Sequence, residues 1–258
     1  EENVPVHFND VKESLDRELL SNVYWHSQTI LLLKRAHRFF PLIEPILKQY
    51  GVPDDFKYIP VIESGFLNIG SSAGARGYWQ LVEATAKENG LEINEDIDER
   101  NHIEKSTIAA CKFFKKAFQK FNSWPMVAAS YNMGITGLSN QVQNQGTTNF
   151  YDLWLNTETG RYVFRIIAMK LIFENPEMYG IVIPKKNLYK PIPTNDITID
   201  SSITNLFSFA KSQGLSYKAF KTANPWLVST KLSNKTNKQY TIKIPANGFR
   251  ELTFGEDE

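Results

Sequence analysis

The sequence predicts a mainly α-helical protein that ends in a small α+β module. Apolar residues recur at helical spacing through the first 180 residues, whereas β-branched and proline-rich sequence begins near Gly180. The charge balance changes at the same place, because residues 181–254 hold 11 Lys and Arg against 3 Asp and Glu. We therefore expect a helical domain at 1–180, a linker at 181–195 and an α+β module at 196–258.

The expected helices follow from start and stop signals. Asp10, with Glu13 three residues later, is typical of a capping box before a first helix. Gly51 is expected to end one helical segment, and Pro53 with the acids after it to begin the next. Apolar periodicity predicts the helical stretches themselves at 30–40, 42–50, 53–64, 106–121, 125–129 and 158–173.

The C-terminal segment has the sequence of a strand–helix–helix–strand unit. Pro184, Pro191 and Pro193 mark the linker before it. Short runs rich in β-branched residues predict strands, and Gly214 is expected to end a helix. The expected order is a strand at 197–199, helices at 202–213 and 217–222, and a strand at 240–244.

Composition excludes several classes of protein. With 258 residues, 42% hydrophobic and 22% charged, the chain is not disordered throughout. A net charge of +1 argues against a nucleic-acid-binding protein. No run reaches 18 apolar residues, so we expect no transmembrane segment. The first residues lack the pattern of a signal peptide, and the first residues of a processed chain would lack it too.

Metal and thiol chemistry are not expected either. The single cysteine, Cys111, excludes an internal disulfide and lies in apolar helical sequence, where a small core residue is predicted. The four histidines show no pair at metal-ligand spacing. We therefore expect neither a metal nor a cofactor.

Glu63 is the candidate for chemistry. It is expected in the last turn of a helix, among the apolar residues Val61, Ile62 and Phe66. The negative end of the helix dipole and apolar surroundings both favour the protonated carboxyl, which raises its pKa. A general acid that works near neutral pH needs such a shift. The alternative interpretation is a surface glutamate at a helix end.

Two other segments carry residues that suit a sugar ligand. A loop of small residues leads to Tyr78, Trp79 and Gln80, and a second segment places Tyr131 and Asn132 at a helix end. An aromatic ring can stack on the apolar face of a sugar while an amide binds its hydroxyls. Taken singly, each segment has the alternative interpretation of a core aromatic beside a helix cap.

Together these segments resemble the family 1 lytic transglycosylases over residues 20–180. The resemblance implies a lysozyme-like helical catalytic domain with Glu63 as catalytic acid/base. Tyr78 departs from the family pattern, which commonly has Leu, Ile or Val there. The segments that carry the resemblance are Ile62-Glu63-Ser64, Gly74-Ala75-Arg76-Gly77-Tyr78-Trp79-Gln80, Tyr131-Asn132-Met133-Gly134 and Glu158-Thr159 with Tyr162-Val163. The implied substrate-binding residues are Ser64, Tyr78, Trp79, Gln80, Tyr131, Asn132 and Tyr162.

The resemblance also implies the reaction. It is cleavage of the β-1,4 bond between N-acetylmuramic acid and N-acetylglucosamine, which leaves a 1,6-anhydromuramic acid end and needs one carboxylate. The implied partner is the peptidoglycan glycan strand, in the periplasm or cell envelope. A lipid anchor on a preceding N-terminal segment stays open.

The C-terminal module is similar to lysin-motif modules, which bind glycans that contain N-acetylglucosamine. The segments that carry this similarity are 201–214, 216–223, Asn224-Pro225-Trp226-Leu227 and Lys243-Ile244-Pro245. The positive charge of this region fits two interpretations, attraction to an anionic polymer or a solvated lysine-rich face.

Two alternative functions remain at this point. A hydrolase of the goose-lysozyme type would need a second carboxylate, for which Asp96, Asp98 and Glu99 are candidates. We expect helix capping and a salt bridge for them instead, because Asp98 closely precedes Arg100. A non-catalytic peptidoglycan-binding scaffold is the other alternative, and it has no need for a carboxyl at position 63.

Overall fold

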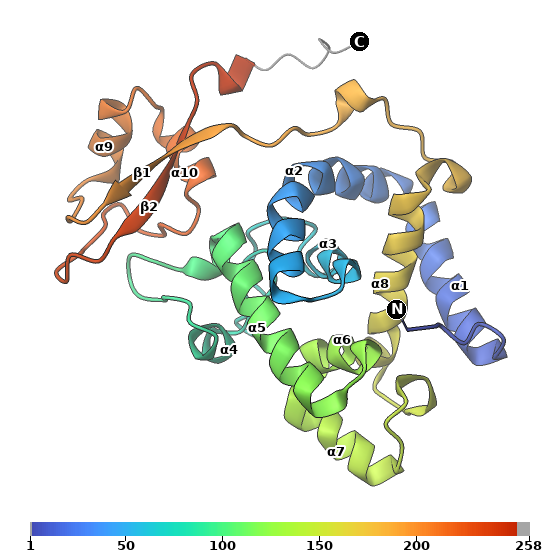
Figure 1. Cartoon of the computed structure of the whole chain (residues 1–258). Coiled ribbons are helices and arrows are strands. Elements are labelled where there is room, and N and C mark those ends of the chain that lie inside the picture. The colour runs from blue at the N-terminus through green and yellow to red at the C-terminus, as the bar shows by residue number, and fades with distance from the viewer. Residues whose placement is uncertain (1, 252–258) are drawn as a thin grey trace.

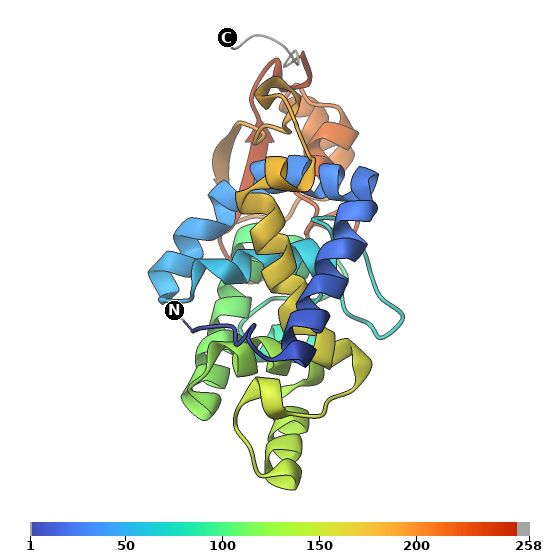
Figure 2. The same cartoon turned by 90° about the vertical axis from the view of Figure 1, so that its right-hand side faces the viewer.

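The computed structural model describes residues 2–251, and its architecture is mainly helical with a small two-stranded sheet near the C-terminal end (Figures 1 and 2). The last residues of the expected module, 252–258, and Glu1 lie outside the described residues. Within the described part, no helix is long and apolar enough to cross a membrane.

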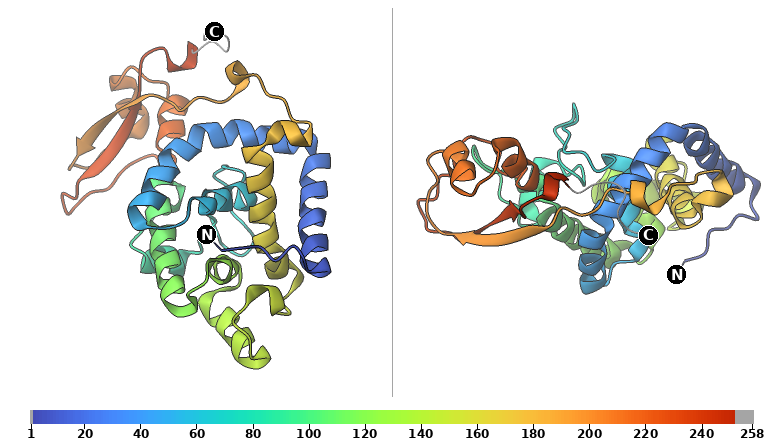
Figure 3. Two further views of the ribbon diagram at one scale, coloured as in Figure 1. Left: turned by 45° about the vertical axis from the view of Figure 1, so that its right-hand side comes forward. Right: turned by 90° about the horizontal axis from the view of Figure 1, so that it is seen from above.

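Two long helices begin the chain. Helix α1 (Asn9–Tyr24) starts after Phe8 without a side-chain cap, so the expected capping box is wrong: Asp10 already lies inside the helix. Helix α2 (His26–Tyr50) is continuous where the sequence showed two apolar stretches, and it ends at Gly51 in the left-handed conformation, as predicted. Figure 3 shows α2 curving, and its internal Pro41 and Pro45 account for the bend because each lacks a backbone N–H.

The segment that carries Glu63 follows directly. A 3-10 helix (Asp54–Tyr58) leads into α3 (Ile59–Glu63), which ends at Ser64 as expected. Figure 3 shows α2 and three later helices arranged around α3: α5 (Ile103–Phe121), α6 (Trp124–Met133) and α8 (Thr157–Glu174). Helix α3 thus lies among these helices, and it contacts α8 and the preceding 3-10 helix.

Five further helices complete the helical part: α4 (Glu83–Glu88), α5 (Ile103–Phe121), α6 (Trp124–Met133), α7 (Ile135–Gln145) and α8 (Thr157–Glu174). Helices α5, α6 and α8 agree with the predictions, and α6 follows Ser123 with a proline in its first turn. The sequence did not predict α4 or α7, because each buries a single residue, Ala86 or Leu138, and so lacks an apolar stripe.

The C-terminal module has the predicted order. Strands β1 (Thr194–Ile199) and β2 (Tyr240–Pro245) pair antiparallel, with Ile197 opposite Ile242. Helices α9 (Leu206–Ser212) and α10 (Tyr217–Ala223) lie between them in sequence. Helix α9 begins later than predicted, because the Asn205 side chain accepts a hydrogen bond from Ser208 N and caps it there.

The module and the helical part are interleaved rather than only linked. Ile97, from the helical part, is fully buried in the apolar cluster of the module, with Trp226 and Leu227. Backbone hydrogen bonds join Asp98 N to Trp226 O (2.8 Å) and Val228 N to Asp96 O (2.9 Å). We call residues 96–98 the shared segment.

Side chains reinforce this junction. The Asp96 carboxylate accepts hydrogen bonds from Ser229 Oγ (2.7 Å) and Ser233 N (2.9 Å). Burial acts to raise the pKa of Asp96, but these hydrogen bonds and the charge of Lys231 outweigh it, so the pKa is lowered. The shared segment is thus bound through both its backbone and its side chains.

Candidate active site

Glu63 is partly buried and accepts one strong hydrogen bond. The Tyr162 hydroxyl, which is fully buried on α8, donates to Glu63 Oε1 at 2.6 Å. Oε2 has no hydrogen-bond partner among the described residues. Burial raises the pKa of the carboxyl, while the Tyr162 hydrogen bond and the positive charge of Arg165 lower it less strongly. The predicted direction of the pKa shift is therefore confirmed, with desolvation as its main cause.

Two arginines hold the backbone of the turn that carries Glu63. Arg165 Nη2, on α8, donates to Ile62 O at 2.8 Å, and Arg35 Nη1, on α2, donates to Gly65 O at 3.1 Å. Carbonyl groups at the end of a helix have no partner within it, so these guanidinium groups satisfy them. The Glu63 side chain consequently starts from a backbone fixed by two different helices.

Tyr131 lies close to this carboxyl, at the end of α6. Its hydroxyl donates to the Trp79 carbonyl oxygen at 2.6 Å. Burial, and then the negative charge of Glu63, raise the pKa of Tyr131 far above its usual value. Tyr131 therefore connects α6 to the loop of residues 74–81 beside Glu63.

Asn132 organises the start of α8. Its Nδ2 donates to Glu158 Oε1 at 3.1 Å, and its Oδ1 accepts from Thr159 Oγ1 at 2.7 Å. The negative charge of Glu158 contributes to the raised pKa of Glu63. The structure thus brings Glu63, Tyr131 and Tyr162 together, with Asn132 beside them through Glu158.

Trp79 and Gln80 support the site from within the protein. The Trp79 ring is fully buried and its Nε1 donates to Thr107 Oγ1 at 2.9 Å. Gln80 Nε2 donates to Ile69 O (3.0 Å) and Gly77 O (2.8 Å). In this structure both side chains fix the 74–81 loop.

Ser64 and Tyr78 are also engaged with the protein. Ser64 is buried, and its Oγ donates to the Tyr78 carbonyl oxygen at 2.7 Å, which ties the Glu63 turn to the 74–81 loop. The Tyr78 hydroxyl accepts from Asn68 Nδ2 at 3.1 Å, and its side chain lines a cavity that Glu63 does not line. The structure therefore does not bring the Tyr78 ring to Glu63.

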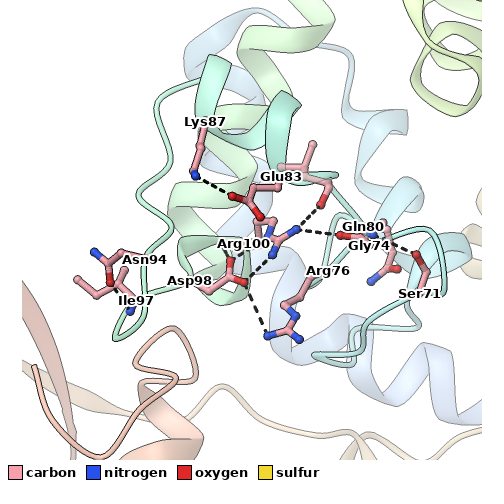
Figure 4. A network of polar contacts seen from close by, with 12 residues as sticks. Ser71, Gly74, Arg76, Gln80, Glu83, Lys87, Asn94, Ile97, Asp98 and Arg100 are labelled. Atoms are coloured by element: carbon pink, nitrogen blue, oxygen red, sulfur yellow. Dashed lines mark hydrogen bonds and ion pairs between the residues drawn. The ribbon is translucent and has the colours of Figure 1, made fainter.

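Arg100 holds the 74–81 loop from the other side (Figure 4). Its Nε and Nη2 donate to the two carboxylate oxygens of Asp98 at 2.9 and 2.7 Å, and its Nη1 donates to Gly74 O (3.0 Å) and Leu81 O (3.3 Å). Asp98 also caps the 3-10 helix Glu99–Asn101 by accepting from Arg100 N. The capping and the salt bridge expected for Asp98 are both confirmed.

Arg165 and Arg35 were not among the predicted site residues. Arg165 follows Tyr162 by three residues on a helix, so both lie on one face, and this spacing was a usable signal. Arg35 precedes Gly65 by 30 residues in the sequence, and nothing in the local sequence around Arg35 indicates their hydrogen bond.

The potential metal ligands do not gather in one place. No cluster of three or more His, Cys, Asp or Glu side chains that could hold a metal ion occurs in residues 2–251. Cys111 is fully buried, as expected, and burial raises the pKa of its thiol to about 12. The thiolate needed for nucleophilic attack is therefore strongly disfavoured.

Comparison with known proteins identifies both parts of the chain. Residues 41–154 match the family described as the transglycosylase SLT domain, and residues 195–248 match the soluble lytic transglycosylase C-terminal LysM-like domain. The chain therefore carries an SLT transglycosylase domain followed by a LysM-like domain. Both resemblances, and the predicted fold class, are confirmed.

The chain is also similar to individual curated proteins. It is 26% identical over 255 residues to the membrane-bound lytic murein transglycosylase D of Escherichia coli (strain K12), and equally to the protein of that name from Escherichia coli O6:H1. Each match covers 95% of this chain and 55% of the relative. The chain thus spans about half the length of these relatives.

Proposed function

We propose that this chain is a peptidoglycan lytic transglycosylase with Glu63 as its single acid/base. The observation that carries the proposal is the state of the Glu63 carboxyl: burial raises its pKa, Tyr162 holds Oε1, and Oε2 has no partner among the described residues. A protonated carboxyl with one oxygen fixed is suited to donate a proton to a substrate. The SLT match supports glycan as that substrate.

The proposed reaction has two proton transfers through the same group. Glu63 gives its proton to the glycosidic oxygen as the bond to C1 of N-acetylmuramic acid breaks and positive charge develops on the ring. The 6-hydroxyl of the same sugar then attacks C1, and the ionised Glu63 takes its proton. The products are a 1,6-anhydromuramic acid end and a free N-acetylglucosamine hydroxyl, so no water is consumed.

The positions of the other site residues relative to Glu63 are the basis for their proposed roles. Tyr131 and Asn132 are proposed to hold the muramyl and glucosaminyl rings, and the fully buried Tyr162 is proposed to hold Glu63 in position for them. Ser64, Trp79 and Gln80 are proposed to keep the adjoining loop in place for the substrate. The domain boundaries that go with this proposal are 1–180 for catalysis, 181–195 for the linker and 196–258 for the glycan-binding module.

Location follows from the substrate. An enzyme that cuts peptidoglycan works in the cell envelope or periplasm, and its LysM-like module is proposed to bind the glycan strand there. The excess of Lys and Arg over Asp and Glu in residues 181–254 supports attraction to an anionic polymer.

The goose-type lysozyme is disfavoured by the partners of the candidate second carboxylates. Asp98 binds Arg100 through both oxygens, and Asp96 binds Ser229 and Ser233 of the module. The third candidate, Glu99, is paired with Lys105 and accepts a hydrogen bond from Glu92 N. None of the three is free to activate a water molecule. A binding-only scaffold, in turn, gives no reason to bury a carboxyl against Tyr162.

Mass spectrometry of the fragments released from purified sacculi tests the proposal. We expect muropeptides that end in 1,6-anhydromuramic acid, each lighter by one water than the hydrolytic product. Reducing ends would indicate a lysozyme instead. Sacculi that bind the protein but release nothing would indicate a scaffold.

Replacing Tyr162 by Phe is expected to shift the pH dependence of this activity. The Tyr162 hydrogen bond stabilises the ionised form of Glu63, so its removal raises the pKa of Glu63 further. Activity that needs protonated Glu63 falls as pH rises through this pKa. The alkaline limb of the pH–rate profile should therefore move to higher pH, measured as kcat/KM on soluble glycan. A limb that stays in place or moves to lower pH would contradict this role of Tyr162.

A further inference from the structure

A cavity of about 360 Å³ lies between the helical part and the module. Helix α2, the loop after Glu63, the start of α5, the linker, the end of α10 and β2 all contribute to its wall. Its volume lies in the range of about 300–1,000 Å³ that is typical of small-ligand sites. Glu63 does not line it, so it is separate from the candidate active site.

The wall of this cavity is mostly apolar. Phe39, Phe66 and Ile103 come from the helical part, and Pro225 and Trp226 from the module. Such a wall favours a ligand with an apolar side chain, because contact with it removes apolar surface from water.

A polar side chain without a protein partner also faces the cavity. Asn101 is only 6% exposed, yet its side-chain amide makes no hydrogen bond to the described residues. The Glu104 carboxylate, by contrast, is engaged by the protein: His102 Nδ1 lies 3.2 Å from Oε2, Lys243 contacts Oε1, and Oε2 is fully buried rather than open to the cavity. A polar group that faces a cavity without a protein partner indicates a ligand group that completes it, and Asn101 is such a group.

A positively charged side chain also lines the cavity. Arg38 Nε donates to Lys190 O at 3.0 Å, whereas its two Nη groups make no hydrogen bond within residues 2–251. Arg38 lines the cavity, and a guanidinium binds a carboxylate through two parallel hydrogen bonds. Among the described residues that line the cavity, Lys243 is already paired with Glu104, whereas Arg38, whose guanidinium lies over the Tyr189 ring, has its two Nη groups left for a ligand.

We propose that this cavity binds a short apolar peptide with a free C-terminal carboxylate. The carboxylate pairs with the Nη groups of Arg38, and a peptide group pairs its C=O and N–H with the amide of Asn101. An apolar side chain of the peptide contacts Phe66 and Trp226. This site is independent of the glycan chemistry proposed above.

Isothermal titration of the whole chain with N-acetyl-leucyl-alanine and with its C-terminal amide tests the proposal. The free acid should bind at least tenfold more tightly than the amide. Arg38→Met keeps the aliphatic stem and should remove that difference, whereas Arg17→Met, at an exposed arginine of α1 outside the cavity, should preserve it. Binding of acid and amide with equal affinity by the unaltered chain would overturn the role of Arg38.

Asn101→Leu separates binding from folding. Leucine has a similar size and replaces an amide that makes no hydrogen bond to the described residues, so the thermal unfolding midpoint should stay the same or rise, while peptide affinity falls at least tenfold. No saturable binding of the peptide at millimolar concentration would overturn the proposal. Tight binding of an N-acetylglucosamine trimer, lost in the Arg38 and Asn101 variants, would assign the cavity to glycan and overturn it too.

Discussion

Glu63→Gln is expected to lower the rate of glycan cleavage by roughly 10²–10⁴-fold, the usual range for loss of a general acid or base. Glutamine keeps the size of the side chain and can still accept the hydrogen bond from Tyr162, so the fold and the site should persist. It has no proton to transfer in either step. The measurement is single-turnover cleavage of a defined glycan oligomer, with binding of the same oligomer followed in parallel.

Glu13→Gln provides the matched control, since Glu13 is an exposed carboxylate on α1. It should cleave at the unaltered rate. Binding by Glu63→Gln should also be unchanged, because the substituted group acts in the chemical steps. Cleavage by Glu63→Gln at the unaltered rate would mean that the acid lies elsewhere.

Gly77→Ala is expected to unfold the 74–81 loop or destabilise the whole chain. Gly77 has φ of +79°, where an L side chain costs about 1–2 kcal/mol. A Cβ there would lie 2.5 Å from the carbonyl carbon of Arg100 and would overlap its oxygen. That neighbour is backbone and cannot move aside as a side chain can. The overlap should therefore cost a further ~1–3 kcal/mol, the usual cost of overpacking a core.

Gly74→Ala separates the conformational cost of the positive φ from the cost of the overlap with Arg100. Gly74 has nearly the same φ, +81°, but a Cβ there meets no atom within 4 Å. It should lose only the conformational part, about 1–2 kcal/mol. Urea unfolding of both variants gives the comparison. Equal losses in free energy would mean that the close approach of Arg100 to the loop is unimportant.

Local sequence was sufficient to predict the helices that carry Glu63 and Tyr162. Both depend on short-range signals: Pro53 with acids begins the Glu63 segment, and apolar periodicity predicts the helix at 158–173. The structure adds the Asn156 cap of α8, which accepts from Thr159 N. The raised pKa of Glu63 followed from its apolar neighbours. The hydrogen bond between Glu63 and Tyr162 spans 99 residues, so only the family resemblance brought them together.

The surroundings of Trp79 could not be predicted in this way. An aromatic residue beside an amide fits an exposed sugar platform or a core position equally well. The structure places Trp79 in the core. There Thr107 accepts a hydrogen bond from the Trp79 indole, and the centre of the Phe114 ring lies 5.9 Å from that of Trp79. Both come from α5, and no local pattern indicates that α5 covers this loop.

The shared segment links the folding of the two parts. Ile97 is the one residue of the helical part in the apolar cluster of the module, and its burial stabilises the fold by about 1.5–3 kcal/mol. The hydrogen bonds of Asp96 and Asp98 to the module add to this. A chain cut at the linker would expose Ile97 and leave these groups without their partners. We therefore expect the two domains that sequence families separate to unfold as one cooperative unit, and loss of the module to loosen Arg100 and, with it, the loop beside Glu63.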